Sequence, residues 1–385
     1  MNVGVIGLGA RIAALVPEFR DVAPDLQFAA VADPSDARIG ALGSKPVARY
    51  DTAEQMLAAQ RFDMLMIGSP NHLHLEHIRH ALQSDTPHIF VEKPLVTTID
   101  QSLELAELIA RHDGHRRLMV GLVLRYSPLY RALRQAQADG HLGEIMSIEA
   151  SEHIAPYHGS FFMRDWRRNR EFSGGFMLEK CCHDIDLYQG VVGARAMHVA
   201  SFGGRKKYVP QHRPDRAPAY LARMSPRWNG QDDAFSGQGD IVDYQTAIVQ
   251  YENGAALTFH TNLNVPDEFR RFAVIGRDGM AEGDFIRNRF RVTGSDLGDC
   301  ICDLDPVTDA ATSDQGHYGA DRAMARDIMA YVRGEAAALP LGCVDALEAG
   351  ITAMAMDQAM AGMRVVDLAP VWAKLDMALS AKAFA

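Results

Sequence analysis

Five short apolar runs alternate with longer amphipathic stretches between residues 1 and 123. Each run is rich in Val, Ile, Leu or Met and is bounded by Gly, Pro, Asn or Asp, which is typical of strands buried on both faces. The runs cover residues 3–7, 28–33, 64–68, 89–92 and 118–123. Residues 99–111 have apolar side chains on one helical face and acidic ones on the other. This alternation predicts an α/β fold whose first domain, residues 1–123, is a doubly wound parallel sheet.

From residue 124 onward the pattern favours strands. A helix is predicted over 128–138, a strand over 145–153, and a second helix from near Gly175 to Val191. Two hairpins are predicted around Glu252-Asn253-Gly254 and Arg277-Asp278-Gly279. Their paired strands are residues 244–251 with 255–262 and 270–276 with 280–285, and two helices, 320–332 and 344–361, close the chain. We therefore expect a second domain over residues 124–385, built on an antiparallel sheet.

The segment 204–239 is polar, contains four prolines and shows no clear period. Long connections without a regular pattern are uncommon inside compact domains, and they are either surface insertions or functional loops. Both interpretations stay open for this segment, the functional one being a lid or a wall of the substrate pocket.

Composition excludes several classes of protein. The chain has 39 Lys and Arg against 49 Asp and Glu, a net charge of −10 at pH 7, so a general nucleic-acid binder or a binder of anionic membranes is not expected. Its apolar stretches are too short for a membrane-spanning helix, and the first residues do not read as a signal peptide. The five cysteines have neither zinc-site spacing nor an even number, which predicts free thiols in the cytoplasm.

A glycine-rich turn follows the first predicted strand. In Gly7-Leu8-Gly9-Ala10-Arg11-Ile12, the first glycine permits a tight turn and the second lets the backbone approach a pyrophosphate at a helix N-terminus. The third position of this dinucleotide-binding pattern is Ile12 instead of Gly or Ala, so we expect looser packing of helix on strand. Asp33 closes the next strand, where a carboxylate accepts the ribose hydroxyls of NAD and repels the 2′-phosphate of NADP. The sequence therefore predicts NAD rather than NADP.

Three further motifs suggest a family. They are Ser69-Pro70-Asn71-His72-Leu73-His74, Glu92-Lys93-Pro94, and Glu179-Lys180-Cys181-Cys182-His183-Asp184-Ile185-Asp186. Together with the glycine-rich turn, their order and spacing resemble the Gfo/Idh/MocA family, named for glucose–fructose oxidoreductase and inositol dehydrogenase. The resemblance implies a Rossmann domain, an α/β domain with an open mixed sheet, and NAD(P)-linked oxidoreduction of a sugar or cyclitol. It also implies a homodimer or homotetramer formed through the C-terminal sheet.

The resemblance assigns roles to individual residues. Asn71 and His74 would lie beside the nicotinamide, and Lys93 would be the active-site lysine. The family usually has an Asp four residues before its catalytic His, where this chain has Glu179 and His183, and Asp186 matches an acid three residues after the His. With the glycine-rich turn, the expected cofactor-binding residues are Gly7, Gly9, Ala10, Arg11, Ile12, Asp33, Ser69, Pro70, Asn71, His74, Glu92 and Lys93.

Oxidation of a carbinol needs a hydride acceptor and a base for the hydroxyl proton. The imidazole of His183 exchanges protons near neutral pH, so it is the candidate base. Lys93 follows a predicted strand at the edge where such folds bind ligands, and a cation there stabilises a developing alkoxide. Glu179 would orient the imidazole or hold a substrate hydroxyl from the same helix face. Glu179 and His183 could instead be two metal ligands, but we find no third ligand with suitable spacing and predict no metal.

A second polar cluster lies between residues 153 and 170. Its members are His153, Tyr157, His158, Arg164, Asp165, Trp166, Arg167, Arg168 and Arg170. Such a run of arginines is usually a solvated face, but in the family the segment borders the substrate pocket. There Trp166 could stack on a sugar ring and an arginine could clamp an anionic substrate group. The expected substrate-binding residues are Lys93, Arg125, Tyr157, Arg164, Trp166, Glu179, His183 and Asp186, with His317 and Tyr318 as further candidates.

Three functions are compatible with these motifs. The first is an NAD-dependent dehydrogenase acting on a CH–OH group of a sugar, sugar acid or cyclitol, with Lys93 and His183 handling the hydroxyl proton. The second is an NAD-dependent glycoside hydrolase or lyase that oxidises its substrate transiently, eliminates a substituent and takes the hydride back, using a second base such as Glu179 or a tyrosine. The third, a non-catalytic dinucleotide-binding module, ranks last because Lys93 and His183 are both present.

Overall fold

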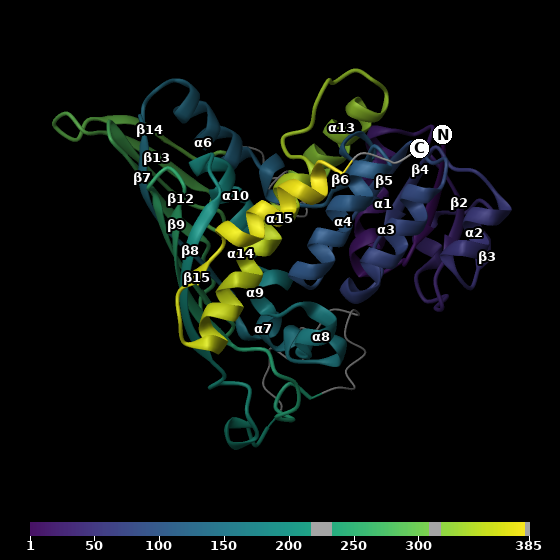
Figure 1. Ribbon diagram of the computed structural model, residues 1–385, viewed down its shortest axis with the longest axis horizontal. Helices are drawn as coiled ribbons and strands as arrows, with labels where there is room; N and C mark the ends of the chain where they lie inside the picture. Colours follow the sequence, from purple (N-terminus) through teal and green to yellow (C-terminus); the bar gives the residue numbers. More distant parts are fainter. Residues whose placement is uncertain (217–232, 308–316, 382–385) are drawn as a thin grey trace. The chain divides into compact units, whose positions relative to one another are not determined.

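The computed structural model describes residues 1–216, 233–307 and 317–381, which form two compact units (Figure 1). The first unit comprises Met1–Tyr126, Gln315–Ile351 and Pro370–Ala385, and the second comprises Ser127–Asp314 and Thr352–Ala369. The units are therefore not consecutive segments of the chain. No helix within the described residues has both the length and the apolar character needed to cross a bilayer.

The first unit is built on a parallel sheet with the strand order β3-β2-β1-β4-β5-β6, as the sequence predicts. Apolar pairs such as Val5 with Val31 and with Met66 fix the register. Strand β3 was not predicted, because it is short and largely exposed. The strands are β1 (Asn2–Ile6), β2 (Gln27–Ala32), β3 (Ala48–Tyr50), β4 (Met64–Ile67), β5 (His88–Val91) and β6 (Leu118–Val120).

The helices of the first unit come from both ends of the chain. From the N-terminal part come α1 (Ala10–Val22), α2 (Ala53–Ala59), α3 (His74–Gln83), α4 (Ile99–Arg111) and α5 (Gly114–Arg117). Helix α13 (Ala320–Val332) packs beside α1, and ion pairs link Arg322 to Asp21 and Arg333 to Asp25. The predicted domain boundary between residues 123 and 124 stays a prediction. By contacts between residues, a helix from the C-terminal part belongs with the first unit, where it packs beside α1. A helix that the sequence did not predict, α15 (Ala369–Leu379), follows α14 (Cys343–Gly362).

The second unit contains a nine-stranded sheet with the order β14-β13-β12-β11-β7-β10-β9-β8-β15. Strands β7 and β10 pair in parallel, and the other described neighbours pair antiparallel. This confirms the predicted open, largely antiparallel mixed sheet. The strands are β7 (Ile145–His153), β8 (Ala196–Gly204), β9 (Tyr244–Tyr251), β10 (Ala256–Asn262), β11 (Arg271–Gly276), β12 (Gly279–Asp284), β13 (Arg289–Gly294), β14 (Cys300–Leu304) and β15 (Val366–Asp367).

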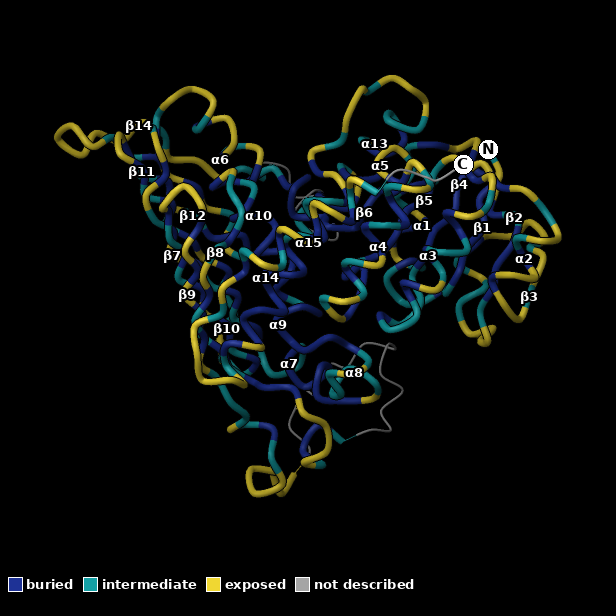
Figure 2. The backbone as a smooth tube through the Cα atoms, in the orientation of Figure 1, coloured by how far each residue is buried: buried dark blue, intermediate teal, exposed yellow. Residues whose placement is uncertain are grey.

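Buried and exposed residues alternate along strands of this sheet (Figure 2), so that its two faces differ in burial. Side chains such as Ile148, Val249 and Phe259 are buried on one face, where α6 (Pro128–Ala138) and α10 (Cys182–Val192) contact the sheet. On the other face, Phe202 and Ile248 are 64% and 53% exposed. Alternation along each strand thus divides an inner apolar face from an outer face that carries exposed apolar side chains.

The described flanks of segment 204–239 are anchored in the second unit. The Asp243 carboxylate accepts hydrogen bonds from the backbone N–H groups of Lys206, Lys207 and Tyr208. The Tyr208 side chain is buried, and its hydroxyl donates to the carbonyl of Leu263 at 2.9 Å. Residues 217–232, on which the choice between insertion and lid depends, lie outside the described residues.

Candidate functional site

The glycine-rich turn joins β1 to α1 in the conformation that its residues predict. Gly7 has φ +78°, and a Cβ there would lie 2.4 Å from the backbone nitrogen of Ser69. A Cβ on Gly9 would lie 2.9 Å from the carbonyl oxygen of Gly68. Both positions therefore require glycine, the first for its backbone angle and both for the close approach of the neighbouring strand end.

Ile12 does not loosen the packing of α1, contrary to the expectation from its sequence position. Its side chain is fully buried. A Cβ on Gly68, which directly follows β4, would lie 2.1 Å from Cγ1 of Ile12. The glycine that permits close packing thus directly follows the neighbouring strand instead of standing at the third position of the motif.

Asp33 links the glycine-rich turn to the end of β2. Its Oδ2 accepts a hydrogen bond of 2.7 Å from the backbone N–H of Leu8, and its Oδ1 accepts one of 2.7 Å from Ser35. Each carboxylate oxygen can accept a further hydrogen bond. Asp33 can therefore hold the turn and accept a ribose hydroxyl at the same time.

The side chain of Arg11 lies against two carboxylates. Its Nε is 3.2 Å from Oε1 of Glu92, and its Nη1 and Nη2 donate to the Asp321 carboxylate at 2.7 and 2.6 Å. The sequence places Arg11 among the cofactor-binding residues because of its position after the glycines. In the structure its backbone lies in the first turn of α1, and its guanidinium links α1 to Glu92, which follows β5, and to Asp321 in α13.

His74 joins two of the motif loops. It is buried, with Nδ1 2.7 Å from the carbonyl oxygen of Pro94 and Nε2 2.8 Å from that of Ser69. Ser69 Oγ lies 2.8 Å from Nδ1 of His77, and Asn71 is buried in the short helix that precedes α3. These contacts hold the loop of residues 69–74 against the Glu92-Lys93-Pro94 loop, whose Lys93–Pro94 peptide is cis.

Glu92 and Lys93 follow β5 at the carboxyl edge of the parallel sheet. Glu92 is buried, and a Cβ on Gly121 would lie 3.0 Å from its carboxylate oxygens, so Gly121 makes room for this side chain. Burial raises the pKa of Glu92, and the charges of Arg11 and Lys93 offset only part of that effect. Lys93 itself is half-buried.

Glu179, His183 and Asp186 are all buried in the second unit, but they do not share one continuous helix. Glu179 ends the short α9 (Phe176–Glu179), and His183 lies in the first turn of α10. This corrects the expectation of one helix from Gly175 to Val191. The break falls at Lys180 and Cys181, where the Lys180 side chain pairs with Glu152 on β7, its Nζ 2.9 Å from Oε1.

Glu152 and Lys180 belong to a larger cluster of buried charged side chains. Arg270 contacts Glu152 at 2.7 Å and donates two hydrogen bonds, of 2.8 and 2.6 Å, to Asp184. Burial alone would raise the pKa of Glu152, but the charges of Arg270 and Lys180 outweigh it and lower that pKa. This cluster was not predicted from the sequence, although Glu152 lies in the predicted strand of residues 145–153 and its side chain is buried. An acid on the inner face of a strand is the signal that could have revealed it.

The arginine-rich segment is not a solvated face. Arg167 Nε is 3.4 Å from Oε1 of Glu179, and the Arg167 guanidinium lies 4.2 Å from the ring centre of Phe161 and 4.3 Å from that of Trp166. Arg170 lies 3.5 Å from the buried carboxylate of Asp357, and Arg164 is buried. Two of these cations therefore face carboxylates of the same unit.

The contacts described for the remaining candidate residues are with residues of the same unit. In the second unit, the Tyr157 hydroxyl donates to Oε1 of Glu268 at 3.0 Å, a partner that the sequence analysis did not identify. In the first unit, Arg125 is buried in a short helix, and Nδ1 of His317 is 3.1 Å from the Asp321 carboxylate. His317 and Tyr318 have φ values of +50° and +57°. The predicted cofactor residues thus belong to the first unit, and Tyr157, Arg164, Trp166, Glu179, His183 and Asp186 belong to the second.

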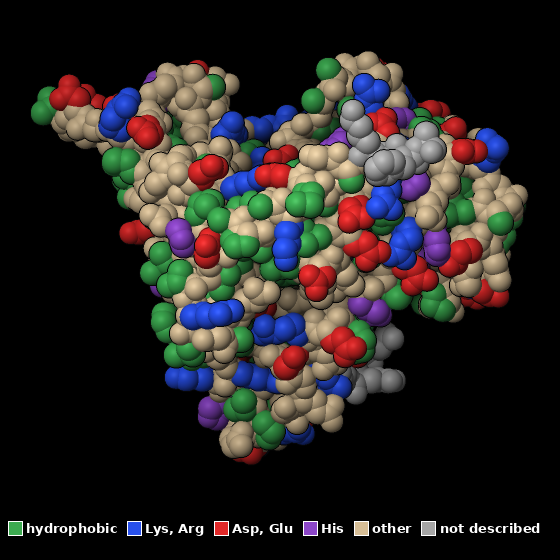
Figure 3. Space-filling view, in the orientation of Figure 1, with side chains coloured by type: hydrophobic (Ala, Val, Ile, Leu, Met, Phe, Trp, Pro, Cys, Tyr) green, Lys and Arg blue, Asp and Glu red, His purple; other side chains and the backbone are tan. Residues whose placement is uncertain are grey.

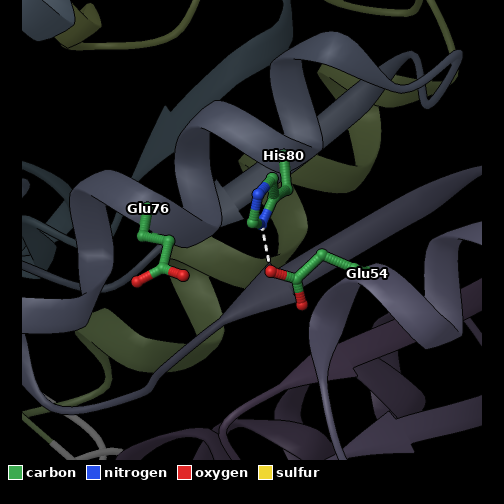
Figure 4. A group of neighbouring side chains, drawn as sticks. All are labelled: Glu54, Glu76 and His80. Atoms are coloured by element: carbon green, nitrogen blue, oxygen red, sulfur yellow. Dashed lines mark ion pairs between the residues drawn. The ribbon is translucent and has the colours of Figure 1, made fainter.

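One group of side chains in the first unit has metal-ligand chemistry (Figure 4). Nδ1 of His80 lies 3.3 Å from Oε1 of Glu54, and Glu76 approaches the same place from α3. Both glutamates are exposed, and the ion pair between His80 and Glu54 accounts for this arrangement without an ion.

Models of one family match most of the chain. Residues 1–122 match its NAD-binding Rossmann fold, and residues 134–368 match its C-terminal alpha/beta domain. The chain belongs to the GFO/IDH/MocA oxidoreductase family. This confirms the resemblance inferred from the motifs, and it identifies the first unit as a domain that binds a nicotinamide cofactor.

Curated relatives and solved structures of this family are similar over most of their length. The oxidoreductase YteT of Bacillus subtilis is 25% identical over 289 residues, which are 65% of this chain and 67% of that protein. D-xylose 1-dehydrogenase (NADP(+)) 2 of Haloferax volcanii is 23% identical over 74% of this chain and 76% of that protein. Levoglucosan dehydrogenase, solved with NADH and L-sorbose, has a TM-score of 0.77 at 18% identity, covering 97% of this chain and 100% of that one.

Proposed function

We propose that this oxidoreductase oxidises a CH–OH group of a sugar or cyclitol with NAD. The proposal is carried by the positions of Lys93 and His183. These two residues match the family's active-site lysine and histidine. Lys93 lies at the carboxyl edge of the parallel sheet, and His183 is buried at the start of α10. Relatives named levoglucosan dehydrogenase, inositol 2-dehydrogenase and D-xylose 1-dehydrogenase support a carbohydrate substrate.

The first unit has features that fit a dinucleotide. Among the described residues, none caps the start of α1 with a side-chain hydrogen bond, so the helix N-terminus can face a pyrophosphate. Asp33, held at the end of β2, would accept the ribose hydroxyls, and we propose NAD rather than NADP on that basis. When bound, the nicotinamide supplies the hydride acceptor.

The proton of the substrate hydroxyl would be handled by the protein. The Lys93 ammonium would donate a hydrogen bond to the reacting oxygen and stabilise the negative charge that develops there. The imidazole of His183 would accept the hydroxyl proton. Glu179, paired with Arg167, would hold a substrate hydroxyl or orient the imidazole instead of serving as a second base.

We propose an uncharged substrate in preference to an anionic one. Arg167 and Arg170, two arginines of the segment predicted to clamp an anion, face the carboxylates of Glu179 and Asp357, so their positive charge is balanced within the unit. Arg164, the arginine of this segment that was predicted to bind the substrate, is buried. The net charge of −10 and the interspersed acidic and basic side chains in Figure 3 favour a small molecule over a polyanion as partner.

The experiment is a spectroscopic assay with a panel of sugars, cyclitols and sugar acids, each offered with NAD and with NADP. We expect net reduction of NAD with an uncharged polyol. Lys93→Met and His183→Asn should each lower kcat/KM by about 100-fold or more, because general acid–base groups contribute roughly that much. Lys45→Met, a change at an exposed lysine of the same unit, should leave it unchanged. Absence of net reduction with every compound would overturn the dehydrogenase proposal.

One contact favours the redox-neutral alternative. The Tyr157 hydroxyl, hydrogen-bonded to Glu268, forms a pair that could remove a carbon-bound proton after transient oxidation. The same assay separates the two routes. Cleavage of a glycoside with catalytic amounts of NAD and no net absorbance change would establish the alternative, whereas stoichiometric NAD reduction would exclude it.

We further propose that two or four copies of the chain associate through the outer face of the nine-stranded sheet. Phe202 on β8 and Ile248 on β9 are exposed there, and Met146 on β7 is 52% exposed. Exposed apolar side chains on neighbouring strands of an open sheet, such as Phe202 on β8 and Ile248 on β9, are costly in water unless another surface covers them. The enzyme's location in the cytoplasm is likewise a proposal, supported by free thiols at Cys181 and Cys343.

A further inference from the structure

The loop that follows β2 carries two carboxylates, Asp33 and Asp36, and an arginine on β3 lies beside it. Strands β2 and β3 pair in parallel, with Ala32 opposite Tyr50. Arg49 therefore comes one residue before the partner of Ala32, near the carboxyl edge of the sheet, where doubly wound folds bind their ligands. In the structure its guanidinium pairs with the Asp36 carboxylate. One cation and two acids thus belong to the part of the unit where the ribose of the cofactor is expected.

Hydrogen bonds hold this loop at both of its ends. At its start, Asp33 accepts hydrogen bonds of 2.7 Å from the backbone N–H groups of Leu8 and Ser35. At its end, Nη1 of Arg20 on α1 donates to the carbonyl oxygen of Ala41 at 3.2 Å. The second carboxylate of the loop lies between these two anchors, so the backbone keeps it beside the arginine of β3.

NAD and NADP differ by one phosphate group, on the 2′ oxygen of the adenosine ribose. An arginine near that oxygen accommodates the phosphate, whereas an acid repels it. Arg49 is such a cation, but the charge of Asp36 offsets its own. The two side chains are 43% and 65% exposed, so water screens the pair and Arg49 can leave it at little cost. The effect of Asp36 on nucleotide affinity should therefore be several-fold, and a larger effect is not expected.

We propose that Asp36 is a second specificity-determining residue for the cofactor, in addition to Asp33: it neutralises Arg49, adds a negative charge of its own, and so disfavours NADP. Once the Asp36 carboxylate is removed, the Arg49 guanidinium would donate hydrogen bonds to a 2′-phosphate, the planar anion-binding geometry that arginine provides. This inference deepens the proposed function and rests on its placing of the ribose at the end of β2.

The test measures the Kd of NADH and of NADPH separately, by their fluorescence, on the full-length protein without a substrate. The wild type should bind NADH more tightly. Asp36→Asn, which keeps the size of the side chain, should tighten NADPH binding at least threefold and change NADH binding less than twofold. If Asp36→Asn does not fold, Asp36→Ser takes its place with the same expectations. An unchanged Kd for NADPH would overturn the proposal.

Asp85→Asn is the matched control. Asp85 is also the exposed acid of an ion pair with an arginine, Arg61, at 3.0 Å, but it precedes β5 and so belongs to the opposite, amino edge of the sheet. Its substitution removes the same charge from the same unit and should leave both Kd values within twofold of the wild type. An equal gain in NADPH binding from Asp85→Asn would reveal a general charge effect and would overturn the proposal.

Two double variants identify the cation. Asp36→Asn with Arg49→Met should lose the gain in NADPH binding, because the phosphate no longer has its partner. Asp36→Asn with Arg38→Met should keep it, since Arg38 is the other arginine of this loop and is not the one that Asp36 engages. A gain that survives Arg49→Met, or one that Arg38→Met abolishes, would overturn the role of Arg49.

These outcomes separate the proposal from the proposed function. If no sugar or cyclitol is oxidised but the variants bind the two nucleotides as expected, the dehydrogenase proposal fails and the role of Asp36 stands. If a polyol is oxidised with NAD but Asp36→Asn binds NADPH no better, the role of Asp36 fails alone. A wild type that prefers NADPH, or one that binds neither nucleotide, would contradict both.

Discussion

Gly68 and Ile12 occupy one shared space: a Cβ on Gly68 would lie 2.1 Å from Cγ1 of Ile12. In the usual dinucleotide-binding motif, a small residue at the third position lets the helix approach the strand. Here the large residue is on the helix and the small one directly follows the neighbouring strand. The helix still packs closely on the strand, but the positions of the large and the small residue are exchanged.

This exchange predicts a compensating pair of substitutions. Ile12→Ala should destabilise the protein by about 2–5 kcal/mol, because it leaves a cavity in a fully buried place. Gly68→Ala should cost about 1–3 kcal/mol through overpacking. The double variant should cost less than the sum by more than about 0.5 kcal/mol, since the new methyl group fills part of the cavity. Equilibrium unfolding in urea measures all three, and strictly additive costs would contradict the shared space.

The buried cluster of the second unit predicts a charge-balance effect. Glu152→Gln leaves Lys180 and Arg270 with Asp184 alone and should cost about 3–5 kcal/mol, because it strands a buried cation. Adding Lys180→Met leaves the balanced Arg270–Asp184 pair, so the double variant should be more stable than Glu152→Gln. Urea unfolding again provides the measurement. A double variant that is less stable than the single one would show that packing of the Lys180 stem outweighs its charge.

The lowered pKa of Asp321 predicts how the free energy of unfolding changes at acid pH. Its folded-state pKa lies below the ordinary value of 3.8, so its stabilising effect is present above that pH and is lost as the pH falls below it. Asp321→Asn should remove a contribution on the order of 2 kcal/mol at neutral pH and a smaller one at about pH 3, because the loss begins below the unfolded pKa of 3.8 and is complete only when the pH has fallen through the lower folded-state pKa. Guanidinium unfolding at about pH 7 and about pH 3 tests the sign. An equal difference between wild type and variant at both pH values would contradict it.

The outer face of the nine-stranded sheet predicts the oligomeric state. Light scattering should find the wild type as a dimer or tetramer, and Ile248→Glu combined with Phe202→Glu should yield monomers, because two carboxylates cannot be buried there without partners. Met377→Glu is a matched control, since Met377 is 74% exposed on α15 in the first unit. A monomeric wild type, or dissociation by the control as well, would contradict the proposed interface.

Helices and strands that have local sequence signals could be predicted with their observed first and last residues. Helix α4 begins after Thr98, whose side chain accepts a hydrogen bond from the Gln101 N–H, and α6 begins after Ser127, which caps Tyr130 in the same way. Strand β7 was predicted with its observed bounds. The break between α9 and α10 was not predicted, and the ion pair found there joins Lys180 to Glu152, which is 28 residues earlier in the chain.

The candidate site also combines residues that local sequence signals predict with residues whose contacts depend on distant parts of the chain. The motifs identified Gly7, Gly9 and Asp33 with the conformations that the structure shows, because each depends on its own backbone and immediate neighbours. The partners of Arg11 could not be predicted, since Asp321 lies 310 residues away in the chain. The same holds for Arg167, whose contact with Glu179 depends on how α9 folds back toward the arginine-rich segment.

The position of α13 beside α1 has a consequence for biosynthesis. A ribosome releases the chain from its N-terminus, so α1 leaves the exit tunnel long before the helix that covers it. At about 5–20 residues per second, the 310 residues between Arg11 and Asp321 take roughly 15–60 s to translate. During that interval α1 lacks the helix that packs beside it. The unit whose synthesis begins first is therefore completed only after α13 has been made.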